Sequence, residues 1–171
     1  MLGTLEESPR RWRVAVVDDD ASALRATSRL LSVDGYEVTA FSSSAEFFAS
    51  LPAVMPDVML VDLRMPEVNG LELQAAVKER ALRIPMVFMS AYASVASSVQ
   101  ALRAGAVDFL EKPYDRNTLL GAVERAIDSA DRERKRSSSR AELVRAMTSK
   151  TPVWSASFRV GTRTECGKSR A

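Results

Sequence analysis

Short apolar runs alternate along this chain with segments whose apolar residues recur at helical spacing. The runs that we expect to form strands are residues 13–17, 36–41, 57–61, 84–89 and 106–110. The expected helices are residues 21–33, 44–51, 70–82, 94–104 and one from Asp115, with Leu119, Val123, Ile127 and Ala130 along one face. Five strands interleaved with five helices predict right-handed βαβ units. We therefore expect a doubly wound α/β domain with a parallel sheet covered on both faces.

The helical periodicity weakens after Lys135. The stretch SSSRAELVRAM (137–147) either extends the last helix or adds a further one. The chain beyond about residue 150 is aperiodic and rich in Ser, Thr, Arg and Gly, so we expect it to be irregular and disordered. The predicted organisation is an N-terminal extension (1–11), one domain (12–128) and a basic linker and tail (129–171).

Composition narrows the possible chemistry. The chain has no histidine and one cysteine, Cys166, which excludes histidine acid–base catalysis, histidine or cysteine-cluster metal sites and an internal disulfide. No apolar run is long enough to span a bilayer, and the N-terminus lacks a signal-peptide core. A cytoplasmic protein without a membrane partner is the expectation.

Charge is distributed unevenly. Residues 1–128 carry 13 Lys and Arg against 18 Asp and Glu, whereas residues 129–171 carry 11 against 4. An acidic body therefore precedes a basic tail. Basic tails can bind nucleic acid, but most such runs are simply solvated.

Polar residues follow four of the predicted strands. Asp18 and Asp19 follow the first, Asp62 the third and Ser90 the fourth, and Lys112 comes shortly after the fifth. Ligands of open parallel sheets bind at the carboxyl ends of the strands, so these side chains should converge. Carboxylates suit Mg²⁺, and an aspartate can form an aspartyl-phosphate whose oxygens an ammonium and a hydroxyl would neutralise. The pattern predicts a phosphoryl-transfer site.

The segments VVDDDAS, DVMLVDLRMPEVNG, VFMSAY and GAVDFLEKPYD resemble the receiver domain of two-component response regulators. The resemblance covers roughly residues 12–128 and is greatest to receivers of the FixJ/LuxR-type transcriptional regulators. It implies a flavodoxin-like (CheY-like) fold and a signalling domain in a phosphorelay, not an enzyme.

The resemblance also implies roles for individual residues. Asp62 is the implied phospho-acceptor, and Ser90 and Lys112 are the implied phosphoryl contacts. The implied Mg²⁺ ligands are Asp18, Asp19, Asp62 and the backbone carbonyl of Arg64. The implied switch residues are Ser90 and Phe109. A cis bond is implied at Lys112–Pro113. The implied partners are a sensor histidine kinase and a second copy bound through the fourth helix, fifth strand and fifth helix.

Simpler interpretations remain open for several residues. Asp20 is better explained as the cap of the helix from Ala21. Phe109 could be an ordinary core aromatic. Gly70 suggests a backbone conformation that only glycine adopts easily. The spacing of Asp18 and Asp20 also fits a haloacid-dehalogenase-type phosphatase, although the Asp62 and Lys112–Pro113 segments argue against it. Glycine-rich nucleotide-binding motifs are absent.

The C-terminal end departs from the pattern of such regulators, which carry a helix-turn-helix domain after the receiver. The residues after Lys150 are too few and too aperiodic for one. One hypothesis is a DNA-binding transcriptional regulator whose output domain is truncated or frame-shifted near residue 150. The other is a single-domain receiver with a basic tail. DNA is not an expected partner of the chain as it stands.

Overall fold

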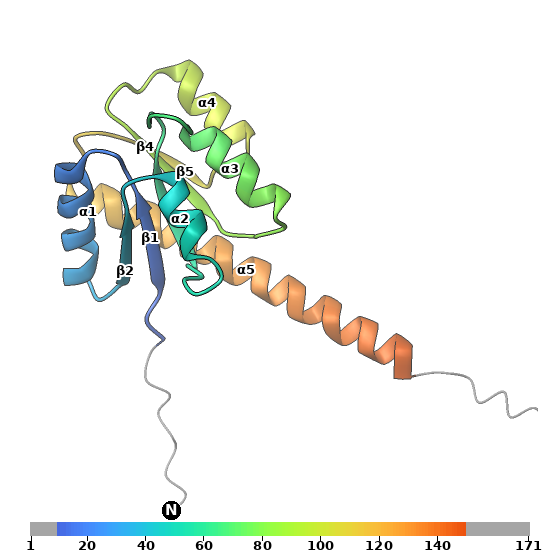
Figure 1. The fold of residues 1–171 in the computed structure, drawn as a ribbon. Helices are drawn as coiled ribbons and strands as arrows, with labels where there is room; N and C mark the ends of the chain where they lie inside the picture. Colours follow the sequence, from blue (N-terminus) through green and yellow to red (C-terminus); the bar gives the residue numbers. More distant parts are fainter. Residues whose placement is uncertain (1–9, 150–171) are drawn as a thin grey trace, which may run out of the picture. The chain divides into compact units, whose positions relative to one another are not determined.

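The computed structural model describes residues 10–149 and shows alternating strands and helices (Figure 1). The strands are β1 (Arg13–Val17), β2 (Glu37–Phe41), β3 (Val58–Asp62), β4 (Met86–Ser90) and β5 (Asp108–Glu111). All pairings are parallel and the order is β2-β1-β3-β4-β5. This is the flavodoxin-like order, and it confirms the predicted fold class.

Five helices connect and follow the strands. They are α1 (Ala21–Val33), α2 (Ser44–Ser50), α3 (Gly70–Glu79), α4 (Val95–Arg103) and α5 (Arg116–Ser149). Asp20 caps α1, because its carboxylate accepts hydrogen bonds from the backbone N–H groups of Ser22 and Ala23, at 2.8 and 3.1 Å. Ser43 caps α2, because its hydroxyl accepts a hydrogen bond from the backbone N–H of Glu46. The capping prediction for Asp20 is therefore confirmed.

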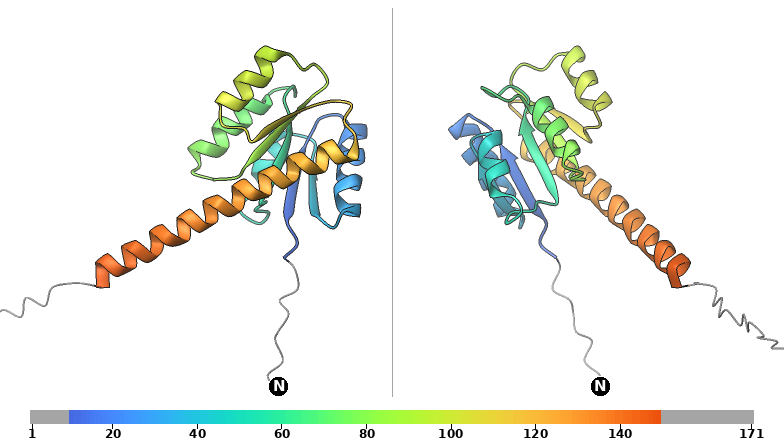
Figure 2. Two further views of the ribbon diagram at one scale, coloured as in Figure 1. Left: turned by 180° about the vertical axis from the view of Figure 1, so that it is seen from behind. Right: turned by 45° about the vertical axis from the view of Figure 1, so that its right-hand side comes forward.

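Two apolar cores lie on the two faces of the sheet, and Figure 2 shows the helices around it from two further directions. One core packs Phe47 of α2, Leu73 of α3 and Ala101 of α4 against alternate strand residues such as Val61. The other packs side chains of α1 and α5 against the intervening strand residues. Because β3 and β4 are buried on both faces, their sequences are continuous apolar runs without alternation.

The ends of three strands differ from the prediction. β3, β4 and β5 begin one or two residues later than the apolar runs do, and each ends one residue later. Asp62 and Ser90 are consequently the last residues of β3 and β4, and they are paired within the sheet instead of following it. Backbone pairing thus directly fixes the position of both functional candidates.

The last helix is longer than the apolar face predicted. Residues 129–149, assigned to the linker and tail, are helical, so the first of the two possibilities for 137–147 is correct. Arg and Ala, which recur in this segment, favour a helix even where little is buried. Within the described residues, the chain divides into two units, with the boundary between Ser137 and Ser138. The expected disorder beyond residue 150 lies outside the described residues.

Within residues 10–149, no helix is long and apolar enough to cross a membrane.

Candidate functional site

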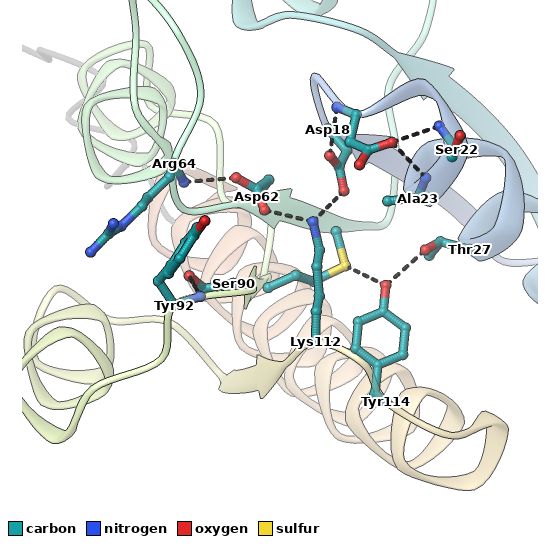
Figure 3. Close-up of polar contacts among 12 residues, drawn as sticks. Asp18, Ser22, Ala23, Thr27, Asp62, Arg64, Ser90, Tyr92, Lys112 and Tyr114 are labelled. Carbon is teal, nitrogen blue, oxygen red and sulfur yellow. Dashed lines mark hydrogen bonds and ion pairs between the residues drawn. The ribbon is translucent and has the colours of Figure 1, made fainter.

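Three predicted site residues meet directly at the carboxyl ends of the strands (Figure 3). The ammonium nitrogen of Lys112 lies 2.6 Å from Oδ2 of Asp18 and 2.6 Å from Oδ1 of Asp62. Asp18 directly follows β1, Asp62 ends β3 and Lys112 follows β5, so the parallel sheet brings together residues up to 94 positions apart. The predicted convergence of these three side chains is therefore observed.

The electrostatics of this cluster follow from two carboxylates sharing one ammonium. Burial raises the pKa of Asp18, only 1% exposed, and the hydrogen bond and attraction of Lys112 offset this only in part. Burial alone would lower the pKa of Lys112, but Asp18 and Asp62 together outweigh it and the pKa is raised. Lys112 therefore stays charged, and the cluster retains an excess of negative charge.

Backbone groups hold the second oxygen of Asp62. The N–H of Arg64 donates to Oδ2 at 2.7 Å. The guanidinium of Arg64 stacks on the ring of Tyr92, with its carbon 4.9 Å from the ring centre. This contact links the loops that follow β3 and β4 beside Asp62, as Figure 3 shows. The sequence prediction used only the carbonyl of Arg64 and missed Tyr92, whose position two residues after Ser90 was the available signal.

The two candidate switch residues occupy different environments. Ser90 is buried at the end of β4, and its hydroxyl accepts a hydrogen bond from the backbone N–H of Tyr92 at 3.2 Å. Phe109 pairs with Phe88 across β4 and β5 and is half-buried against the apolar core. Such packing suits both a core aromatic and a switch aromatic, so the position of Phe109 fits either role.

The oxygen donors proposed for Mg²⁺ fit that ion by their chemistry. Asp18, Asp62 and the solvent-exposed Asp19 lie at adjacent strand ends and offer only hard oxygen ligands. With Lys112 included, these four side chains carry a net charge of about −2, which one divalent cation would neutralise. In the arrangement of residues 10–149, no three acidic groups already converge on a single point, because Lys112 lies between Asp18 and Asp62.

Gly70 shapes the acceptor end of β3 in a way different from the prediction. A Cβ at this position would lie 2.7 Å from the backbone oxygen of Asp62 and 2.9 Å from Cε1 of Phe88. Gly70 is an ordinary first residue of α3, and the positive φ of 66° belongs to Glu67. Close approach, not an unusual backbone conformation, therefore requires glycine here.

Tyr114 is a further residue beside the site that the sequence prediction missed. Its hydroxyl lies 2.7 Å from Oγ1 of Thr27 and 3.1 Å from the sulfur of Met89. Burial raises the pKa of Tyr114. The preceding Lys112–Pro113 bond is cis, as the resemblance implied.

Comparison with known proteins identifies one family over most of the described residues. The family model described as "Response regulator receiver domain" matches residues 14–124. The response regulator protein TodT of Pseudomonas putida is 36% identical over 132 residues, which cover 77% of this chain and 58% of TodT. The chain thus spans less than two thirds of that relative's length.

Solved structures of two regulators are also similar. The crystal structure of FixJ-N superposes with a TM-score of 0.65 at 33% identity, covering 70% of this chain and 95% of FixJ-N. The response regulator StyR superposes with a TM-score of 0.76 at 31% identity, covering 84% of this chain and 72% of StyR.

Proposed function

This chain belongs to the family of response regulator receiver domains, which are regulatory domains, and on that basis we propose that it accepts a phosphoryl group on Asp62. The donor is a phosphohistidine of a sensor histidine kinase, and the setting is the cytoplasm. The observation that carries the proposal is the pairing of Asp62 with Lys112 at 2.6 Å, at the end of β3. At this position the carboxylate of Asp62 is the nucleophile, and the ammonium of Lys112 is a fixed positive charge beside it.

The proposed reaction transfers one phosphoryl group. A carboxylate oxygen of Asp62 attacks phosphorus, the phosphorus–nitrogen bond of the donor breaks, and the imidazole leaves with the electron pair. Lys112 neutralises charge on the equatorial oxygens, and Ser90 at the end of β4 donates its hydroxyl hydrogen to one of them. The N–H of Arg64, bonded to Oδ2 at 2.7 Å, orients the carboxylate.

Asp18, Asp19, Asp62 and the carbonyl of Arg64 are the residues that would hold Mg²⁺. The bound ion would supply further neutralisation of phosphoryl charge. Asp18 and Asp19 provide a negative site beside the acceptor, and Lys112 keeps Asp18 from facing Asp62 without a counter-charge.

The proposed output is a change of the surface formed by α4, β5 and α5. Phosphate on Asp62 adds charge and acceptor oxygens, which attract Ser90 and let Phe109 repack. Three apolar residues of α4, Val95, Val99 and Leu102, are exposed at helical spacing. Exposed apolar side chains of this kind suit a partner or a second copy of the chain. The alternative, DNA binding through the basic tail, would rest on residues 129–171, of which the structure describes 129–149.

Phosphorylation with acetyl phosphate and Mg²⁺, read by intact mass, tests the proposal. The wild-type chain should gain the mass of one phosphoryl group in an acid- and base-labile form, and Asp62→Asn should gain none. Asp128→Asn, an exposed carboxylate on α5, is the matched control and should label normally. Undiminished labelling of a folded Asp62→Asn variant would show that the acceptor is elsewhere.

A further inference from the structure

A cavity lies at the end of the sheet opposite Asp62. Its volume is about 310 Å³, and its wall includes Met86, the first residue of β4, and Val107, just before β5. Asp62 and Ser90, by contrast, are the last residues of parallel strands. The volume is at the lower end of the range for small-molecule sites in proteins, roughly 300–1,000 Å³.

Gln74 of α3 is the unusual residue in this wall. It is only 3% exposed, yet its side chain makes no hydrogen bond to any other residue within the described part of the chain. A glutamine amide has two N–H donors and an acceptor oxygen, and burying these without partners is unfavourable. Buried polar groups are nearly always paired, so this exception calls for a partner from outside the chain.

The amide of Gln74 is also accessible from the cavity. Among the described residues, the hydroxyl of Ser28 is the one fully enclosed side-chain polar atom without a partner. The unpaired amide of Gln74 is therefore not sealed in the core, and Gln74 is part of the cavity wall.

The rest of the cavity indicates the chemistry of a ligand. Val77, Leu82 and Ile84 add to the apolar wall. The charges at the rim already have partners, since Lys78 donates to the carbonyl of Ala104 and Arg83 pairs with Glu133. An ionic ligand would have to displace these contacts, whereas an uncharged one would not.

We propose that this cavity binds a small uncharged molecule with an apolar body and a carboxamide-like edge, in which an N–H lies next to a carbonyl. Such an edge pairs with the amide of Gln74 through two reciprocal hydrogen bonds. The apolar body lies against Val77, Ile84 and Met86. Because α3, β4 and α5 all contribute to the wall, the ligand connects elements on both faces of the sheet, at a site separate from Asp62.

Benzamide is a suitable probe, and N,N-dimethylbenzamide and toluene are its matched controls. The first control keeps the carbonyl but lacks N–H groups, and the second has no polar group. Each is titrated at millimolar concentration into the ¹⁵N-labelled full chain and followed by NMR. Benzamide should shift the side-chain NH₂ of Gln74 and the backbone N–H groups of Gly105 and Val107 in a saturable manner.

Substitutions test whether benzamide binding depends on the side-chain amide of Gln74. Gln74→Leu should weaken benzamide binding about tenfold, as the loss of two neutral hydrogen bonds implies, while Gln100→Leu on the exposed surface of α4 should leave it unchanged. Val107→Trp, which adds a large side chain at another residue of the wall, should abolish binding with Gln74 intact. Asp62→Asn should bind benzamide like the wild type, which separates this proposal from the phosphoryl-acceptor proposal.

Three results would overturn the proposal. The first is the absence of saturable shifts around Gln74 with benzamide. The second is binding of dimethylbenzamide or toluene as strong as that of benzamide. The third is binding to folded Gln74→Leu with wild-type affinity. Either of the last two would mean that the amide does not recognise the ligand.

Discussion

The ammonium nitrogen of Lys112 lies 2.6 Å from Oδ1 of Asp62, and this pair joins the end of β3 to the loop after β5. The same nitrogen contacts Asp18 at 2.6 Å. Lys112 is therefore both the proposed phosphoryl contact and the counter-charge of two buried carboxylates. We therefore expect stability and the proposed function to depend on the same side chain.

Replacing Lys112 with Met should destabilise the fold, because Asp18 and Asp62 would face each other without a counter-charge. We expect a loss of about 3 kcal/mol in the free energy of unfolding, measured by urea denaturation. The double variant Lys112→Met, Asp18→Asn should recover part of that loss. Arg116→Met, which removes an exposed pair with Asp34, should cost less than about 1 kcal/mol. Equal effects of Lys112→Met and Arg116→Met would contradict a buried structural role for the lysine.

Gly70 and Gly121 should respond oppositely to the same substitution. Gly70→Ala places a Cβ 2.7 Å from the backbone oxygen of Asp62, so we expect destabilisation of about 1–3 kcal/mol and slower phosphorylation. Gly121 lies inside α5, where the nearest atom to an added Cβ is the flexible end of Arg125 at 3.3 Å. Gly121→Ala should therefore stabilise the fold by about 0.5–1 kcal/mol. Thermal unfolding of both variants is the measurement, and a stable Gly70→Ala would disprove the close-approach argument.

Asp115 should make the stability of α5 depend on pH. Hydrogen bonds from Thr118, chiefly from its backbone N–H at 2.8 Å, lower the pKa of Asp115 below 3.8. A lowered pKa contributes stability above the unfolded value of 3.8, and this contribution is lost as the pH falls through the folded value. Asp115→Ala should thus lower the urea midpoint at neutral pH, and its deficit should shrink in acid.

Asp115→Asn is the control for that experiment, because its amide oxygen still accepts from Thr118 but does not titrate. It should stay near the wild-type midpoint at neutral pH and lose the acid dependence of this group. A deficit of Asp115→Ala that is the same at every pH would exclude the carboxylate charge as its cause.

The sequence predicted the order of the elements and the three converging side chains, because both follow from strand periodicity and parallel topology. It did not predict where the strands end, since an apolar run does not reveal which backbone groups join the ladder. Asp62 and Ser90 therefore proved to be strand residues. The predicted conformational role of Gly70 was wrong, because the distance of a missing Cβ to another strand is not visible in one segment.

Contacts between distant side chains could not be predicted for a related reason. The stacking of Arg64 on Tyr92 and the unpaired amide of Gln74 depend on rotamers and on packing between elements. The extension of α5 could be foreseen only as one of two possibilities, because few of its apolar residues are buried. Residue type and spacing thus indicate which residues form the candidate site, while three-dimensional packing determines which side chains contact one another.

Another polar cluster lies at the beginning of β3, around Asp57, whose side chain is only 2% exposed. Its carboxylate accepts from Arg10 at 2.9 Å, from the backbone N–H of Arg13 at 3.0 Å and from Arg134 of α5. The ring of Trp12 lies within cation–π distance of Arg10 and Arg134, at 5.4 and 5.2 Å. This cluster attaches α5 to the amino end of the sheet.

Asp57→Ala should therefore destabilise the fold by about 2 kcal/mol, because several charge-assisted hydrogen bonds are lost together. Arg134→Met removes one half-exposed arginine and should cost less than about 1 kcal/mol.

Both variants should shift the emission of Trp12, measured in a Trp154→Phe background so that Trp12 is the one tryptophan. A change of Trp12 emission with Asp57→Ala but none with Arg134→Met would mean that α5 does not contact this ring in solution. An unchanged urea midpoint for Asp57→Ala would show that the cluster contributes nothing to folding.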